Sequence, residues 1–200
     1  MKDSVIILLF FIAGTALGAL GLNPSGIELS KVSGAVLCAL MFLVGFSSGH
    51  NKQLLTQFKS LNIRILLLPL TTILGTFAGC LVCALVIRDF CLKDLLAVGS
   101  GMGYYSLSSV LIGQSRGAQM GTLALLSNII REVCALLLAP LFKRFFGPLS
   151  PIAAGGATTA DTTLPVIRNV CGQTYSIVSV YHGLVVDFCV PFLVSFFCSI

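Results

Sequence analysis

The chain has 200 residues, of which 56% are hydrophobic and 10% are charged. Soluble domains carry about 25% charged residues, so this composition excludes an ordinary soluble protein and indicates an integral membrane protein. The net charge of +5 comes from Lys and Arg residues that lie mostly in short segments between apolar runs. Such a distribution is typical of membrane topology, and it gives no support for nucleic-acid binding.

Five apolar runs are long enough to cross a bilayer, which takes about 20 residues each. They predict an all-α polytopic membrane protein in which residues 1–200 form a single transmembrane domain. Lys2 precedes the first run, which we interpret as an uncleaved helix because equally apolar runs recur to the C-terminus. The five runs are residues 5–22, 29–47, 63–87, 121–142 and 174–197.

Two shorter segments, 95–113 and 148–166, are interrupted by helix-breaking residues. The first contains GSGMG at residues 99–103, and the second contains GG at 155–156, four threonines and Pro165. Backbone groups freed by such breaks cannot face lipid, so both segments are predicted to be broken or re-entrant helices. Their shared order of Gly-rich turn, hydroxyl-rich stretch and aliphatic end favours an inverted repeat around a midplane transport site. Two independent Gly-rich loops are the alternative.

Basic residues predict the orientation in the membrane. If both broken segments re-enter, six of them fall on one side, which should be cytoplasmic. The N-terminus is then cytoplasmic and the C-terminus outside. The six residues are Lys52, Lys59, Arg64, Lys143, Arg144 and Arg168.

The eight cysteines lie mostly within apolar runs at irregular spacing, and we interpret them as small apolar side chains. Cys80 and Cys83 form a CxxC motif, but no second pair or His accompanies it. The pattern therefore predicts neither a metal site nor another cofactor.

Two carboxylates are predicted at membrane depth, Glu132 in the run 121–142 and Asp161 in the segment 148–166. Insertion of a carboxylate at a helix centre costs roughly 2.5–3.5 kcal/mol, so such residues indicate a substrate or proton site. A packed ion pair is the alternative. Burial raises the pKa of an unpaired carboxyl group, so either acid is expected to release a proton when a cationic substrate arrives, which is a physical basis for antiport.

Polar neighbours surround both acids. Asn128 precedes Glu132 by four residues, so the two share a helix face. Arg131 points elsewhere, and pairing with Asp187, snorkelling or binding of a substrate carboxylate all remain open. Hydroxyl groups flank Asp161 and would suit an ammonium group or sodium; they belong to Thr158, Thr159, Thr162 and Thr163.

Other polar residues near the breaks are weaker candidates. Tyr104 and Tyr105 could form a cation-π wall or simply pack. His182 and Asp187 lie five residues apart on the last run and do not closely share a face, so separate polar contacts are favoured over a relay.

Ordered motifs along the chain resemble the LysO lysine exporter family. They are FLVG (42–45), GSGMGYYSLSS (99–109), SNIIREVCALLLAPL (127–141), GGATTADTTLPVI (155–167), YHG (181–183) and VPF (190–192). The resemblance implies export of L-lysine and its analogue thialysine across the bacterial inner membrane by proton antiport. It places the family's two essential acids at Glu132 and Asp161, and it maps Tyr105, Ser106, Ser108 and His182 onto family motifs.

The chain departs from the family in two respects. Single-chain members carry about three further helices before the matched region, which predicts a small, separately encoded membrane subunit or a homo-oligomer. Some members have Asp where this chain has Ile129, and others have a small neutral residue where it has Asp187.

Other functions are open on the residues alone. A channel also uses re-entrant segments, and a sodium-coupled transporter of another cation or amino acid, or an accessory subunit, would fit the pattern. An intramembrane aspartyl protease would use Asp161 and Asp187, but its GxGD context is missing. A rhomboid-like protease would use Ser106 and His182, but GxSG is missing, so a non-enzymatic protein is predicted.

Overall fold

The computed structural model describes residues 62–200 together with isolated residues between 13 and 46. Residues 62–200 belong to one compact unit, residues 39–200, and every element in them is helical. The predicted helices at 5–22 and 29–47 lie largely outside the described residues, as do Lys52 and Lys59 of the predicted cytoplasmic loop.

Three helices of this unit are long and apolar enough to span a membrane: α5 (Leu68–Val86), α8 (Ala118–Phe146) and α11 (Tyr175–Ser199). They correspond to the predicted helices at 63–87, 121–142 and 174–197, which confirms the all-α prediction, with membrane-length helices, for the described residues. A short helix, α4 (Ile63–Leu66), precedes α5. Pro69 lies in the first turn of α5, where its missing N–H removes no helical hydrogen bond.

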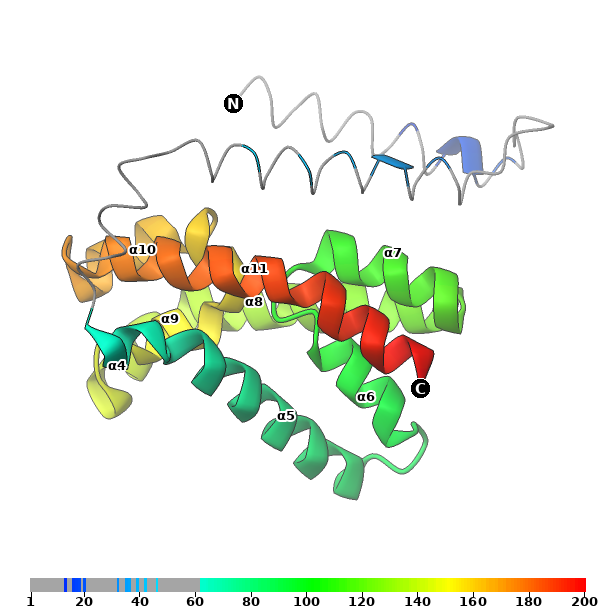
Figure 1. Ribbon diagram of the computed structural model, residues 1–200, viewed down its shortest axis with the longest axis horizontal. Coiled ribbons are helices and arrows are strands. Elements are labelled where there is room, and N and C mark those ends of the chain that lie inside the picture. The colour runs from blue at the N-terminus through cyan, green and yellow to red at the C-terminus, as the bar shows by residue number, and fades with distance from the viewer. Residues whose placement is uncertain are drawn as a thin grey trace. The chain divides into compact units, whose positions relative to one another are not determined.

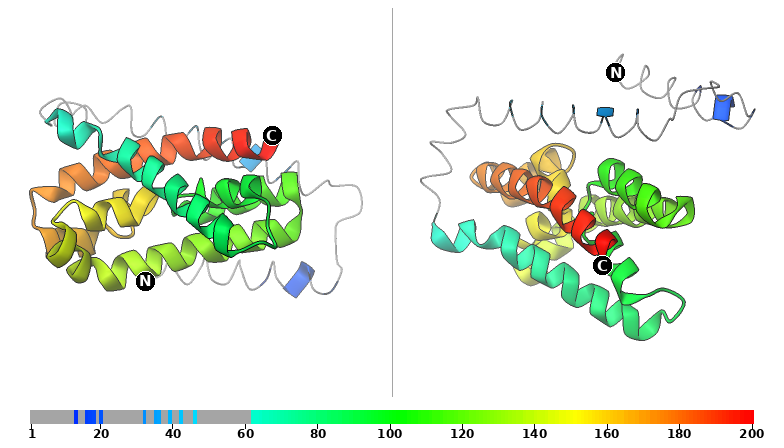
Figure 2. Two further views of the ribbon diagram at one scale, coloured as in Figure 1. Left: turned by 90° about the horizontal axis from the view of Figure 1, so that it is seen from below. Right: turned by 45° about the vertical axis from the view of Figure 1, so that its right-hand side comes forward.

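The helices are interrupted in both segments where the sequence predicts breaks. In the first broken hairpin, residues 100–104 separate α6 (Leu92–Gly99) from α7 (Tyr105–Arg116). The second broken hairpin contains α9 (Ser150–Gly155), the 3-10 turn η1 (Gly156–Ala160) and α10 (Leu164–Cys171). Figures 1 and 2 show the two hairpins at opposite ends of the long helices α8 and α11.

Both ends of the first broken hairpin lie at the C-terminal end of α11. Lys93, at the start of α6, donates a hydrogen bond through Nζ to the main-chain oxygen of Ile200 (2.5 Å). Arg116, at the end of α7, donates to the carbonyl of Phe197 (3.1 Å) and forms an ion pair with Asp94 (3.4 Å). The chain therefore enters and leaves this hairpin at the same end of α11.

The second broken hairpin starts and ends at the C-terminal end of α8. The Ser150 hydroxyl donates to the carbonyl of Phe142 (2.7 Å), and Lys143 Nζ donates to the carbonyl of Val170 near the end of α10 (2.6 Å). Both ends of this hairpin are thus tied to the end of α8 that lies far from α7, and its tip points back toward the first hairpin (Figure 1).

The tips of the two hairpins meet through a backbone hydrogen bond. The Ala157 N–H donates to the carbonyl of Met102 (2.9 Å). Gly103 and Gly156 flank this bond with φ angles of +96° and +66°. A Cβ atom on Gly103 would lie 3.0 Å from the Gly155 carbonyl, and one on Gly156 would clash with the carbonyl oxygen of Met102. The close approach of the two tips therefore depends on glycine at both positions.

Asn128 on α8 satisfies backbone groups that the first break sets free. Its side chain is 3% exposed, and its Oδ1 accepts a hydrogen bond from the Gly103 N–H (2.7 Å). Its Nδ2 donates to the carbonyls of Ala124 (2.8 Å) and Val98 (3.4 Å). Because an unsatisfied backbone group in an apolar interior costs several kcal/mol, this amide holds the broken backbone next to α8.

Arg131 performs the same task for the second break. Its Nε donates to the carbonyl of Ala154 (3.0 Å), Nη2 to that of Ala153 (3.2 Å) and Nη1 to the Thr76 hydroxyl of α5 (3.2 Å). The two carbonyls end α9, where the helix dipole attracts a cation. The predicted alternative of pairing with Asp187 is therefore wrong, because the guanidinium is directed to the end of α9.

His182 links three elements at a fully buried position of α11. Its ring nitrogens form hydrogen bonds with the hydroxyls of Thr72 on α5 (2.9 Å) and Thr159 in η1 (3.1 Å). The Ser179 hydroxyl donates to the Thr159 carbonyl (2.7 Å), and Gly183 lets η1 pack directly against α11. These contacts fix the second break against α11.

We predict that Gly156→Ala lowers the melting temperature of the purified protein in detergent much more than Gly147→Ala. Both glycines have a φ angle that disfavours a side chain, +66° and +87°, which costs about 1–3 kcal/mol in either variant. Gly147 has open space beyond its Cα, whereas Gly156 faces the Met102 carbonyl. Equal melting temperatures for the two variants would contradict the tip contact.

We also predict that Asn128→Ala destabilises the protein by about 1–3 kcal/mol, because it leaves the Gly103 N–H buried without its acceptor. The matched control is Asn169→Ala, since Asn169 is exposed on α10. Thermal unfolding in detergent measures both. A loss for Asn128→Ala no larger than for the control would show that the amide does not support the break.

Candidate functional site

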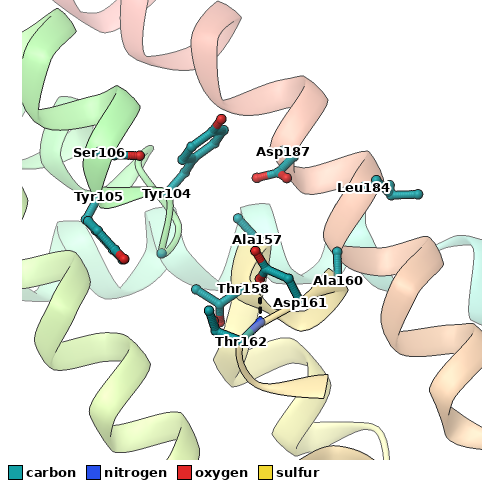
Figure 3. A pocket seen from close by; sticks show the side chains of 11 residues that line it. Tyr104, Tyr105, Ser106, Ala157, Thr158, Ala160, Asp161, Thr162, Leu184 and Asp187 are labelled. Atoms are coloured by element: carbon teal, nitrogen blue, oxygen red, sulfur yellow. Dashed lines mark hydrogen bonds between the residues drawn. The ribbon is translucent and has the colours of Figure 1, made fainter. Parts of the chain in front are cut away.

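A cavity of about 290 Å³ lies beside the meeting point of the two tips. Its walls come from the start of α7, from the second break and from one face of α11 (Figure 3). The lining residues are Gly103, Tyr104, Tyr105, Ser106, Ala157, Thr158, Ala160, Asp161, Thr162, Leu184 and Asp187.

Asp161 lies in the second break, between the end of η1 and the start of α10. Its Oδ1 accepts a hydrogen bond from the Thr162 N–H, and its carboxylate faces the cavity (Figure 3). The broken backbone thus presents one carboxyl group to the cavity.

Asp187 presents a second carboxylate from the opposite wall. It lies on α11, and Figure 3 shows its side chain directed into the same cavity as Asp161. The two carboxylates are close enough to interact electrostatically. Because no Lys, Arg or His is among the cavity's lining residues in the described part of the chain, the cavity favours a cationic ligand.

Tyr104 and Tyr105 form the aromatic side of the cavity. The Tyr104 hydroxyl can donate a hydrogen bond, and its ring face can contact a cation.

Half of the residues predicted from the sequence line this cavity. These are Tyr105, Ser106, Thr158, Asp161 and Thr162. The other five lie outside the cavity lining: Ser108, Asn128, Glu132, Thr159 and His182.

Four of those five have structural contacts. Asn128 supports the first break, and Thr159 and His182 hydrogen-bond to each other. The buried Ser108 hydroxyl donates to the Tyr104 carbonyl (2.8 Å) at the start of α7. These four residues shape the backbone around the cavity and do not face it.

Glu132 lies on α8, one helical turn after Asn128, within electrostatic range of Tyr105. It is partly buried, and no hydrogen bond or ion pair joins it to any residue in the described part of the chain. Its charge therefore acts next to the cavity wall that Tyr105 provides.

Asp187 lines the cavity, although sequence reasoning considered it only as a partner of Arg131, in a relay with His182 or as a protease acid, and did not predict it as a transport-site residue. The signal that singled out Glu132 and Asp161, an acid at membrane depth, applies equally to Asp187. Its five-residue spacing from His182 drew attention to a relay, but in the structure the His182 ring binds Thr72 and Thr159.

The residues described contain no group of three or more His, Cys, Asp or Glu side chains that could hold a metal ion. Seven of the eight cysteines are described, and all seven are free thiols. A second cavity, of about 460 Å³, lies between α5, α8 and α9 and includes Arg131 and Thr76. Since Arg131 there binds main-chain carbonyls and Thr76, we place the candidate site at the acidic cavity.

Comparison with known proteins agrees with the family resemblance of the motifs. The family model described as "Lysine exporter LysO" matches residues 8–198. The chain is 32% identical over 187 residues to the "Lysine exporter LysO" of Escherichia coli strain K12, covering 93% of this chain and 61% of that protein. It is also 32% identical over 164 residues to a "Putative lysine exporter" of Haemophilus influenzae, covering 82% of this chain and 83% of that protein.

No solved structure matches the chain. The match of the family model nonetheless extends over nearly the whole sequence, including both broken hairpins and all three membrane-length helices of the described part. The chain therefore belongs to the lysine exporter LysO family.

Proposed function

We propose that this chain exports L-lysine across the bacterial inner membrane in exchange for protons, with the acidic cavity as the substrate site. The observation that carries the proposal is the cavity beside the meeting point of two broken hairpins, with Asp161 and Asp187 facing it and no basic lining residue among those described. The names of the two relatives indicate the substrate. Export of analogues such as thialysine is part of the same proposal.

The cavity offers suitable partners for the lysine ammonium groups. An ammonium group has three hydrogen-bond donors and no acceptor. The Asp161 carboxylate and the hydroxyl oxygens of Thr158 and Tyr104, all lining residues, can accept these hydrogen bonds. The volume of about 290 Å³ is close to the lower end of ligand pockets, about 300 Å³. A small amino acid is therefore the appropriate size of substrate.

Exchange follows from competition for one carboxylate. At membrane depth a carboxylate is costly unless a proton or another cation neutralises it. Asp161 then holds either a proton or the substrate ammonium, and release of one accompanies binding of the other. Glu132, beside Tyr105, is proposed as the second acid of this proton pathway.

We propose that both broken hairpins re-enter the membrane from opposite faces as an inverted repeat. Each hairpin begins and ends at the same end of a long helix, and the two tips meet at the Ala157–Met102 hydrogen bond. Broken helices that meet near the membrane centre form the substrate sites of many secondary transporters. The cytoplasmic N-terminus and external C-terminus, inferred from the basic residues, belong to this proposal.

Further helices are proposed to pack on α5. Gly75 and Gly79 lie one turn apart with nothing within 4 Å of the position of a Cβ atom, a spacing that allows close helix contact in membranes. A small, separately encoded subunit or a second copy of the chain could supply these helices. Light scattering of the purified protein in detergent distinguishes the two sources. A mass above that of one chain indicates a second copy, whereas the mass of one chain indicates a separate subunit.

One feature favours an alternative function, an intramembrane aspartyl protease, because Asp161 and Asp187 share a cavity. The family match favours transport. A Ser106–His182 protease is disfavoured, because both His182 nitrogens bind threonine hydroxyls while Ser106 lines the cavity.

The transport prediction is tested in proteoliposomes loaded with labelled lysine and placed in a more acidic medium. Protons moving inward should drive lysine outward in the parent protein. Asp161→Asn and Glu132→Gln are expected to reduce this gradient-driven efflux at least about tenfold. Each replaces a carboxyl group, which can bind and release a proton, with an amide, which cannot. Asp89→Asn, which neutralises an exposed acid outside the cavity, is the matched control and should transport like the parent.

Three results would contradict the proposal in different ways. Efflux that persists in both neutralised variants would show that these carboxylates do not couple transport. Efflux that follows a sodium gradient and ignores the pH gradient would indicate sodium coupling, and lysine movement without counter-movement of any ion would indicate a channel.

A further inference from the structure

The proposed exchange of lysine for a proton takes place at Asp161. It does not require Asp187. Asp187 lies on α11 next to the fully buried Val186, and its carboxylate faces the cavity across from Asp161 (Figure 3). Asp161 belongs to a break in a hairpin, whereas Asp187 belongs to a continuous helix. Two separate structural elements thus direct one carboxylate each into the same space.

The charged groups around the cavity leave this pair without a protein counterion. Arg131 on α8 donates to the carbonyls of Ala153 and Ala154 and to the Thr76 hydroxyl. His182 is hydrogen-bonded to two threonines. With no basic side chain among the described lining residues, a bound ligand can supply the positive charge that balances the two carboxylates. The cavity can therefore accept two positive groups at once.

The remaining walls suit a flexible chain between those two groups. Tyr104 and Leu184 line the cavity on either side of Asp187, and Ala157 and Ala160 lie near Asp161 (Figure 3). Such apolar surface can cover methylene groups. A carboxylate on the ligand would meet no basic side chain among the described lining residues, so amino groups dominate recognition.

We propose that Asp161 and Asp187 form a two-carboxylate site that binds compounds with two amino groups on one flexible chain, and that Asp187 sets the preference over compounds with one amino group. Lysine carries this chemistry, and so does an α,ω-diamine, which lacks the lysine carboxylate. The inference rests on the proposed function in that it uses the same cavity, and it extends the substrate class to diamines.

The test measures ligand-induced stabilisation of the purified full-length chain in detergent. Ligand binding to the folded state raises the melting temperature with concentration. Lysine is compared with norleucine, which lacks the second amino group, and 1,5-diaminopentane is compared with pentylamine. In the parent protein, half-maximal stabilisation should occur at a concentration at least about tenfold lower for the two-amine member of each pair, a difference of about 1.4 kcal/mol.

Variants at one position assign this preference to Asp187. In Asp187→Asn the concentration ratio of each pair should fall to within about twofold of one, whereas Asp187→Glu should keep a clear preference for two amino groups. Asp187→Ser provides a second neutral variant if the amide does not fold. Asp89→Asn removes an exposed acid elsewhere and should behave like the parent.

The outcomes separate this inference from the proposed function. The role of Asp187 would be overturned if the concentration ratio of each pair were unchanged in both neutral variants, or if the parent showed no preference for two amino groups. Either result would do so even if lysine is exported in proteoliposomes. Asp187-dependent binding of 1,5-diaminopentane without any lysine export would support the two-carboxylate site and overturn lysine as the substrate. A preference for diaminopentane equal to that for lysine would show that the ligand carboxylate contributes little.

Discussion

The hydrogen bond from the Ala157 N–H to the Met102 carbonyl joins two chain segments that could not be stable alone inside a membrane. Each break releases backbone groups that lipid cannot satisfy. Asn128 binds those of the first break and Arg131 those of the second. Because both side chains come from neighbouring turns of α8, one helix holds the two breaks against each other.

The acidic cavity exists because of this arrangement. With the tips in contact, the break that carries Asp161 faces the start of α7 and one side of α11. His182 and Thr159 fix that break to α11 from the other side. Polar residues around the breaks therefore divide into those that hold the backbone in place and those that face the cavity, although both kinds look alike in the sequence.

The charge distribution connects this geometry with the proposed export of a cationic amino acid. The cavity presents carboxylates, and the buried guanidinium of Arg131 is committed to main-chain carbonyls. Membership of the lysine exporter family agrees with a cationic substrate. The chain spans 61% of the length of the Escherichia coli relative, so the activity of that longer protein is proposed here and tested by the transport of the chain itself.

The sequence alone determined the membrane class, the three long helices of the described part, both helix breaks and Asp161 as a cavity residue, because these follow from local hydropathy, glycine content and the cost of a buried charge. The roles of Asn128, Arg131, His182 and Asp187 were decided only by the tertiary structure. Helical spacing says which residues share a face, but it does not say what lies opposite that face. Met102 and Ala157 lie 55 residues apart in the sequence and meet only in the folded chain. In that arrangement Arg131 binds the end of α9, and Asp187 lines the same cavity as Asp161.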